Sequence, residues 1–257
     1  MGYYRRLPLE GLDNARDLGG YPCPDGVTRY GVFIRSELPS SLTAADLDYL
    51  KQLGLTTVLD FRGTPEIRTA PDVLSREDFV RYHHMPAFDE EVSRGADMGE
   101  KRPAPPDMDR ASFQWGSHYA GMAEEHKAWV KSVLELLAEA PGAALFHCTT
   151  GKDRTGIITA LLLGLCGVAR EDIIADYCVS QVYLKTMYST MRHLLPGGDE
   201  MELSDPFFST APENMETLLD HIDGKYGGIE PYLRNGCGVE EATLAALRAK
   251  LLERRCA

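Results

Sequence analysis

Residues 147–156 read HCTTGKDRTG and lie between two apolar runs, 143–146 and 157–163. The first run has the length and flanks of a buried strand, and the second is long enough for a buried helix. The ten residues between them are therefore expected to form a strand–loop–helix turn. Backbone N–H groups at such a turn point at whatever lies before the helix, and they bind anions. The stretch predicts an anion-binding loop with one cysteine and, six positions later, one arginine.

Two residues of this loop are the candidate catalytic pair, Cys148 and Arg154. A cysteine attacks as its thiolate, which a helix N-terminus and nearby cations such as Lys152 favour. Arg154 offers a planar fork that binds two phosphoryl oxygens at once and follows them into the transition state. We therefore predict a nucleophile and a charge-stabilising group in one loop.

The remaining loop residues fit a phosphate-binding role. Thr149, Thr150 and Gly151 supply backbone N–H groups, and Gly151 lets the chain curl tightly because it has no side chain. Thr155 can place a hydroxyl on the thiolate, and Gly156 allows close packing at the helix start. The spacing predicts in-line attack on a phosphate monoester, a cysteinyl phosphate intermediate and release of phosphate by water, with no metal ion or cofactor.

The leaving oxygen needs a proton, and the residues leave its source open. Asp153 is closest in sequence, but the charges of Lys152 and Arg154 would make it a poorer acid. Asp60 ends a predicted strand and is the second candidate. Acids of a long loop are further candidates, namely Asp89, Asp97, Asp107 and Asp109.

Strands and helices alternate along the chain. Apolar and β-branched runs predict strands at residues 30–35, 55–61, 79–85 and 143–146. Periodicity and start signals predict helices at residues 43–53, from 64 onward, 119–140, 157–163, from 171 toward 195, 212–222 and 239–252. Ligands of open α/β sheets bind at the carboxyl ends of the strands. Asp60 and Arg62 are therefore candidate substrate-binding residues, with a surface ion pair as the alternative for Arg62.

We expect a single domain over residues 1–257 with two insertions. Residues 87–112 are rich in proline and acids and read as a long loop, either mobile or a lid. Residues 178–212 are the second insertion, and the family resemblance described below implies a helical lid there. The six cysteines are scattered without a Cys-x-x-Cys pair, which favours reduced thiols over a disulfide framework.

Composition limits the partners. The formal net charge of −12 argues against nucleic acid or an anionic membrane as the main partner. No run of about 20 apolar residues predicts membrane insertion, and the N-terminus lacks the apolar core of a secretory signal. We expect a cytoplasmic protein. His83, His84 and His147 have no recognisable metal-ligand spacing, so no metal site is expected.

The motif of residues 147–156 resembles the signature of cysteine-dependent protein tyrosine phosphatases. Its GKDRT core, residues 151–155, resembles a narrower bacterial group that includes secreted tyrosine and phosphoinositide phosphatases of mycobacteria and Listeria. Residues 14–20, NARDLGG, and residues 60–62, DFR, also agree, although the group usually has leucine at position 61. The resemblance spans nearly the whole chain.

The resemblance implies a three-layer α/β phosphatase fold with a mostly parallel central sheet flanked by helices. It implies Cys148 as nucleophile and Arg154 as phosphate binder, and it favours Asp153 as general acid. Lys152 is linked in this group to substrates beyond phosphotyrosine. Expected substrates are phosphotyrosine proteins, with dual specificity or phosphorylated lipids and small molecules as further classes.

Two alternatives stand beside this hypothesis. A sulfurtransferase or arsenate reductase also uses a cysteine in an anion-binding loop, although residues 152–156 argue against it. A pseudophosphatase would bind phosphorylated partners without turnover, but it would be expected to have lost Cys148 or Arg154, and both are present.

Overall fold

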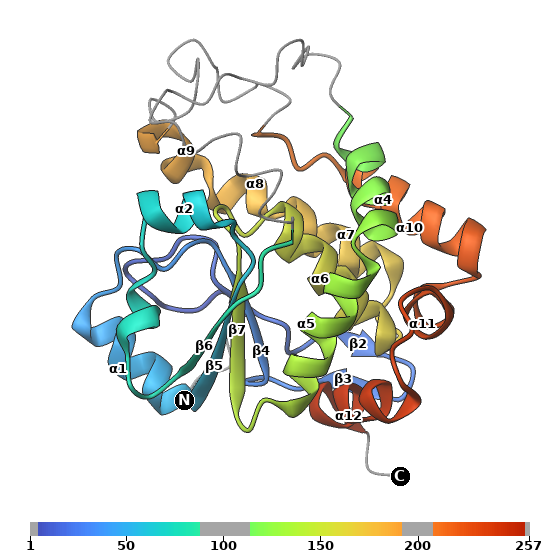
Figure 1. Ribbon diagram of the computed structural model, residues 1–257, viewed down its shortest axis with the longest axis horizontal. Helices are drawn as coiled ribbons and strands as arrows, with labels where there is room; N and C mark the ends of the chain where they lie inside the picture. Colours follow the sequence, from blue (N-terminus) through green and yellow to red (C-terminus); the bar gives the residue numbers. More distant parts are fainter. Residues whose placement is uncertain (1–4, 88–113, 192–207, 255–257) are drawn as a thin grey trace.

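A mostly parallel five-stranded sheet forms the centre of the protein (Figure 1). The computed structural model describes residues 5–87, 114–191 and 208–254. The strand order of this central sheet is β1-β4-β7-β5-β6, and only its β1–β4 pair is antiparallel. The strands are β1 (Arg16–Asp17), β4 (Phe33–Ser36), β5 (Leu55–Asp60), β6 (Arg81–His84) and β7 (Ala143–His147). A second sheet joins β2 (Pro22–Cys23), β3 (Gly26–Thr28) and β8 (Leu252–Arg254).

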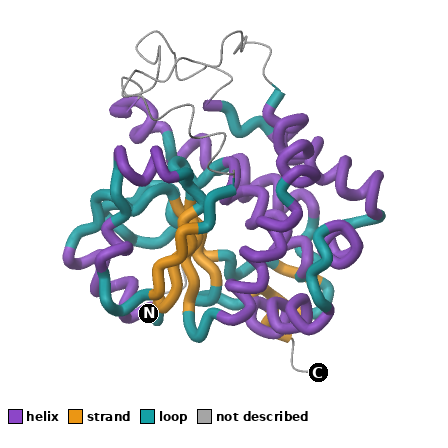
Figure 2. Tube along the Cα trace, viewed as in Figure 1, coloured by secondary structure: helices purple, strands orange, loops and turns teal. Residues whose placement is uncertain are grey.

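Helices cover both faces of the central sheet (Figure 2). The first half of the chain contains α1 (Ala44–Leu53), α2 (Thr64–Thr69), the 3-10 helix η1 (Val73–Arg76), α4 (Trp115–Glu125) and α5 (Lys127–Glu139). The second half contains α6 (Asp153–Leu165), α7 (Arg170–Cys178), α8 (Ser180–Tyr183), α9 (Lys185–Met191), α10 (Pro212–Tyr226), α11 (Ile229–Pro231), the π-helix η5 (Tyr232–Gly236) and α12 (Glu241–Leu251). Within these described residues, no helix is both long and apolar enough to cross a bilayer.

Alternation along the strands divides the core into two layers. In β7, Leu145 packs in the cluster that contains Leu50 of α1, whereas Phe146 packs in the cluster that contains residues of α5 and α6. Neighbouring strand residues point to opposite faces of a sheet, so each strand feeds both clusters. The result is the expected three-layer α/β fold.

Most predicted elements are confirmed. The helix after Thr43 begins with the expected capping box to Asp46 and ends at Gly54, whose φ is 84°. Three helices differ from expectation. The helix that contains residues 157–163 begins earlier, at Asp153, because the loop turns directly into it.

The other two differences are breaks within predicted helices. Residues 119–140 form two helices, because the backbone leaves helical geometry at His126 with φ −113° and ψ 34°. The segment from residue 171 divides into α7, α8 and α9. The break between α7 and α8 falls beside Ser180, whose buried hydroxyl accepts a hydrogen bond from Arg16. Periodicity alone gives no sign of such a long-range contact. Residues 88–113 and 192–207, which include most of the first predicted insertion and part of the second, lie outside the described residues.

A buried charge cluster joins β1 and β4 to α7. The carboxylate of Asp176 accepts hydrogen bonds from Arg16, Arg35 and Tyr21. Arg16 and Arg35 are each at most 2% exposed, so their charges need a buried counterion. Arg35 also donates to the carbonyl of Gly151, which connects the cluster to the predicted anion-binding loop.

We predict that Asp176→Ala lowers the free energy of unfolding by about 3–5 kcal/mol, because it leaves two buried guanidinium groups without their counterion. Urea unfolding followed by circular dichroism measures this change. Asp220→Ala is the matched control, since Asp220 pairs with Arg170 but its side chain is 72% exposed. The control should lose at most about 1 kcal/mol. Equal losses in the two variants would contradict this role for Asp176.

Candidate active site

The predicted anion-binding loop lies at the carboxyl end of β7, between β4 and β5. The strand ends at His147 and α6 begins at Asp153, so residues 148–152 form the loop. Gly151 has φ 68°, and a Cβ there would lie 2.4 Å from the carbonyl oxygen of Ser36. Only glycine therefore fits this point of the loop. The expected strand–loop–helix turn is confirmed.

Hydrogen bonds from the surrounding protein hold the loop carbonyls. The carbonyl of Thr149 accepts from the backbone N–H of Leu38 at 3.1 Å, and that of Thr150 accepts from Asn14 Nδ2 at 3.0 Å. The Gly151 carbonyl accepts from Arg35. In a trans peptide the N–H points away from the C=O, so these carbonyl bonds direct the following N–H groups to the opposite side. The loop thereby gains a face of N–H groups suited to an anion.

Arg154 is fixed by a carboxylate from the neighbouring strand–helix connection. Its Nη1 and Nη2 atoms donate to the two oxygens of Glu66 in α2, at 2.8 and 2.9 Å, and Nη1 also donates to the carbonyl of Phe61 at 3.1 Å. Glu66 accepts a further bond from the Thr149 hydroxyl. Burial alone would raise the pKa of Glu66, but these donors, Arg154 foremost, lower it to about 2. Glu66 is therefore an ionised clamp on Arg154.

The sequence predicts a helix start at Thr64-Pro65-Glu66, but it does not predict that Glu66 binds Arg154. Glu66 Oε2 accepts from the backbone N–H of Gly63 at 2.8 Å, as a capping residue does. The position of Glu66 in the chain could have indicated this contact, because α2 begins directly after the carboxyl end of β5. An acid there is close enough to reach the arginine of the loop.

Asp153 stands at the first position of α6, beside the loop. Its Oδ1 accepts a hydrogen bond from the hydroxyl of Tyr119 in α4 and lies 3.5 Å from Lys152 Nζ. Its side chain is 21% exposed, whereas Lys152 is almost fully buried. Solvent therefore reaches the Asp153 carboxyl more easily than the Lys152 ammonium.

Lys152 is enclosed by protein groups. Its Nζ lies 4.2 Å from the ring centroid of Trp115 and 3.5 Å from the carbonyl oxygen of Ser209. Burial lowers the pKa of Lys152, and the charge of Asp153 acts in the opposite direction. A cation held over an aromatic ring and beside a carboxylate is stabilised despite its burial.

Thr155 and Gly156 occupy the first turn of α6, directly after Arg154. The Thr155 hydroxyl is buried and has no hydrogen-bond partner among the described residues. A Cβ at Gly156 would lie 3.4 Å from the ring of Tyr177. A side chain there would be in van der Waals contact with Tyr177.

Asp60 and Arg62 lie at the carboxyl end of β5, as expected, but they bind each other. Arg62 Nη2 donates to Asp60 Oδ2 at 2.6 Å, and the Tyr82 hydroxyl donates to the same oxygen at 2.6 Å. Asp60 is fully buried, and although desolvation opposes it, these donors hold the pKa of its carboxyl below its usual value. This geometry favours a bracing role for the pair over proton donation or direct phosphate binding.

His147 joins this network from beneath the loop. Its Nε2 lies 3.0 Å from Asp72 Oδ2 and 3.7 Å from Asp60 Oδ2, and its Nδ1 lies 3.1 Å from the carbonyl of Cys148. Asp60, Asp72 and His147 could in principle meet around a cation. Protein donors already occupy the two carboxylates, however, including the backbone N–H of Leu74 on Asp72. The chemistry of the set therefore fits a hydrogen-bonded brace better than a metal site.

The α9 helix lies over the loop. Tyr188 is 6% exposed, and its hydroxyl hydrogen-bonds the side chain of Thr150. The Tyr188 ring packs on Phe208 with centroids 4.4 Å apart. Cys148 is 1% exposed, so its thiol is buried. The acids of the predicted long loop, Asp89, Asp97, Asp107 and Asp109, lie outside the described residues.

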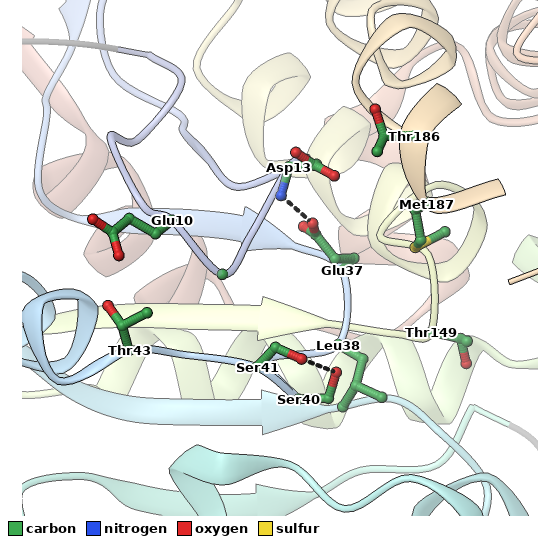
Figure 3. Close-up of a pocket in the computed structure, with 11 residues that line it drawn as sticks. Glu10, Asp13, Glu37, Leu38, Ser40, Ser41, Thr43, Thr149, Thr186 and Met187 are labelled. Atoms are coloured by element: carbon green, nitrogen blue, oxygen red, sulfur yellow. Dashed lines mark hydrogen bonds between the residues drawn. The ribbon is translucent and has the colours of Figure 1, made fainter. Parts of the chain in front are cut away.

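A groove of about 320 Å³ opens beside the loop at Thr149 (Figure 3). Three carboxyl side chains contribute to its wall, those of Glu10, Asp13 and Glu37. The other lining residues are Gly11, Leu38, Ser40, Ser41, Thr43, Thr149, Thr186 and Met187. These lining residues include no basic side chain, so the groove suits neutral or cationic groups rather than a second phosphate.

Comparison with known proteins identifies the family of the chain. A model of the tyrosine phosphatase family matches residues 7–253. A protein of Cupriavidus necator assigned as a tyrosine-protein phosphatase is 31% identical over 242 residues, covering 93% of this chain and 86% of the relative. A tyrosine-protein phosphatase of Nostoc commune is 31% identical over 229 residues, covering 85% of this chain and 74% of the relative.

A third relative is the triple specificity protein phosphatase PtpB of Mycobacterium tuberculosis. It is 26% identical over 287 residues, and the alignment covers 96% of this chain and 99% of PtpB. The expected resemblance to a bacterial tyrosine phosphatase group is thereby confirmed. The chain belongs to the tyrosine phosphatase family, and it is a phosphatase.

Proposed function

We propose that the protein hydrolyses phosphotyrosine through a phosphocysteine formed on Cys148, without a metal ion. The observation that carries this proposal is a buried Cys148 at the start of the loop together with Arg154, at the start of α6, which Glu66 clamps. Arg154 would bind two phosphoryl oxygens, and the loop N–H groups would bind the charge that builds up during transfer. The Thr155 hydroxyl, buried and without a described partner, would donate to the thiolate.

Burial of the nucleophile supports phosphotyrosine as the preferred substrate. Cys148 is 1% exposed and Tyr188 contacts the loop at Thr150, so a substrate phosphate must reach a sulfur that the surrounding protein covers. A phenolic ester extends its phosphate farther from the peptide backbone than a seryl ester does. The aromatic rings of Trp115 and Tyr188 beside the loop would also pack favourably against a phenyl ring.

Phosphorylated lipids are a second substrate class. The name of PtpB records triple specificity for that relative. Lys152 of this chain is the residue linked to such breadth in related phosphatases, and here its ammonium faces Asp153 and Trp115. The acidic groove beside Thr149 would disfavour an inositol ring with several phosphates, so we expect lipid phosphates to be slower substrates.

We propose Asp153 as the general acid rather than Asp60. Asp153 lies at the loop and is partly exposed, whereas the Asp60 carboxylate is buried and bound by Arg62 and Tyr82. Asp60, Arg62 and His147 would act as a brace beneath the site. The family match and the intact Cys148–Arg154 pair favour hydrolysis of a phosphate ester. They favour it over the three alternatives, which are a sulfurtransferase, an arsenate reductase and a pseudophosphatase.

The nucleophile is tested first. We predict that purified protein hydrolyses phosphotyrosine peptides in EDTA and that Cys148→Ser lowers kcat by at least about 10³-fold, because a serine hydroxyl is not ionised here. Cys237→Ser, which changes a buried thiol that hydrogen-bonds Tyr232, should retain activity. Phosphate release from matched phosphotyrosine and phosphoserine peptides measures both activity and preference. An active Cys148→Ser variant would contradict the mechanism.

The clamp is tested by Glu66→Gln. Removing the charge from the carboxylate that orients Arg154 should cost about 1.5–3 kcal/mol, or roughly 10–150-fold in kcat/KM for an aryl phosphate. Glu135→Gln, at an exposed pair with Lys131, is the control and should leave kcat/KM unchanged. Because the pKa of Glu66 is about 2, its clamp should persist well below the ordinary value of 4.5. Unchanged kinetics in Glu66→Gln would argue that Arg154 needs no such support.

The general acid is tested by Asp153→Asn. We expect kcat for an alkyl phosphate to fall by about 100-fold or more, and kcat for an aryl phosphate to fall much less, because phenoxide leaves without a proton more readily. Stopped assays of phosphate release on the two esters measure the difference. Equal losses for both esters would point to another acid.

A further inference from the structure

A chain of buried polar groups leads from Asp153 into the helical layer. The Tyr119 hydroxyl in α4 donates to Asp153 Oδ1 and lies 2.8 Å from the hydroxyl of Tyr177 in α7. Asn214 Nδ2 in α10 donates to the Tyr177 hydroxyl at 3.3 Å. Tyr119 and Tyr177 are 0% and 1% exposed, so water has little access to either hydroxyl. Three helices thus converge on one carboxylate.

The direction of donation along these hydrogen bonds follows from the chemistry of the groups. The Tyr119 hydroxyl has one proton and donates it in the hydrogen bond to Asp153 Oδ1, so Tyr177 is the donor in the hydrogen bond between the two tyrosines. The Tyr177 oxygen in turn accepts a hydrogen bond from Asn214 Nδ2. Each donor therefore points toward Asp153.

The chain also distinguishes the two oxygens of Asp153. Tyr119 and Lys152 both approach Oδ1, the second at 3.5 Å. An oxygen that accepts from a hydroxyl and faces an ammonium is the poorer site for a proton. Oδ2 is the oxygen left to carry one.

We propose that Tyr119, supported by Tyr177 and Asn214, is a positioning residue that holds Asp153 so that Oδ2 delivers the proton to the leaving oxygen. This inference rests on the proposed role of Asp153 as general acid. Tyr119 touches no reacting atom and acts only through the carboxylate.

The proton transfer balances in both steps. In the first, the bond from Cys148 Sγ to phosphorus forms, the phosphorus–oxygen bond breaks, and the leaving oxygen keeps the electron pair and takes the proton from Asp153 Oδ2. In the second, the Asp153 carboxylate takes a proton from water as the water oxygen attacks phosphorus and sulfur leaves with its electron pair. Burial first, and then the Asp153 charge, raise the pKa of Tyr119 well above its usual value. Tyr119 therefore keeps its proton throughout.

Several titratable or charged groups face Asp153 from the elements around it. They are Lys152 and Arg154 of the loop and α6, His118 and Tyr119 of α4, Tyr177 of α7 and Tyr188 of α9. A substitution of Tyr119 must therefore keep the packing around these neighbours. Tyr119→Phe does so, because it keeps the ring and removes only the hydroxyl that contacts Asp153 and Tyr177.

The test measures how kcat depends on the leaving group. A series of phosphate monoesters from p-nitrophenyl to alkyl is hydrolysed by wild type, Tyr119→Phe, Asp153→Asn and the double variant. We expect Tyr119→Phe to lower kcat about 10-fold for alkyl esters and about 2-fold for p-nitrophenyl phosphate, which steepens the leaving-group dependence. In the Asp153→Asn background, Tyr119→Phe should change kcat less than about 2-fold for every ester, because the group that it positions is absent.

Tyr232→Phe is the matched control. Tyr232 is also fully buried, and its hydroxyl donates to the carbonyl of Ala123 at 2.6 Å without contacting Asp153. It should lower the Tm about as much as Tyr119→Phe and leave the leaving-group dependence unchanged. Tyr119→Phe with an unchanged dependence, or with equal effects in both backgrounds, overturns the inference. An unchanged dependence in Asp153→Asn itself would instead overturn the proposed general acid.

Discussion

The bonds that hold the loop carbonyls are the constraint on which the rest of the site depends. A five-residue loop has little structure of its own, and its N–H groups face an anion only if its C=O groups are held elsewhere. Arg35 provides one of these holds at Gly151, and Arg35 in turn needs the buried carboxylate of Asp176. The charge cluster between the sheet and α7 therefore determines the shape of a site to which it contributes no catalytic group.

Local charge, rather than net charge, decides what this acidic chain binds. The formal net charge is −12, yet Lys152 ends the loop, Arg154 lies in the first turn of α6, and each is paired with a nearby carboxylate. Glu66 reaches Arg154 from α2, and Asp153 lies 3.5 Å from Lys152 Nζ. At physiological salt, charges more than about 8 Å away are largely screened, so the acidic surface opposes a phosphate ester only weakly.

Much of the fold and part of the site follow from the sequence. The loop was predictable because apolar runs on both sides indicate a strand and a helix. Cys148 and Arg154 are then placed together at the turn that joins them. Asp60 and Arg62 were placed correctly at a strand end, but their mutual pairing was not predicted, because strand position does not reveal which partner a side chain chooses.

Contacts between distant segments could not be derived. Tyr119 lies 34 positions from Asp153, and Glu66 lies 88 positions from Arg154, so no local pattern joins them. The break between α7 and α8 falls beside another such contact, since Ser180 meets Arg16 only in the folded chain. Sequence reasoning thus identified the reacting loop, while the residues that orient it required the three-dimensional arrangement.

The central claim is that phosphate passes through a covalent bond to Cys148. The most direct measurement is rapid acid quenching during turnover of an aryl phosphate, followed by mass spectrometry of the intact protein and of its peptides. The account predicts a transient population that carries one phosphoryl group, located on Cys148. Turnover with no phosphorylated protein at any quench time, or with the phosphoryl group on another residue, would contradict it.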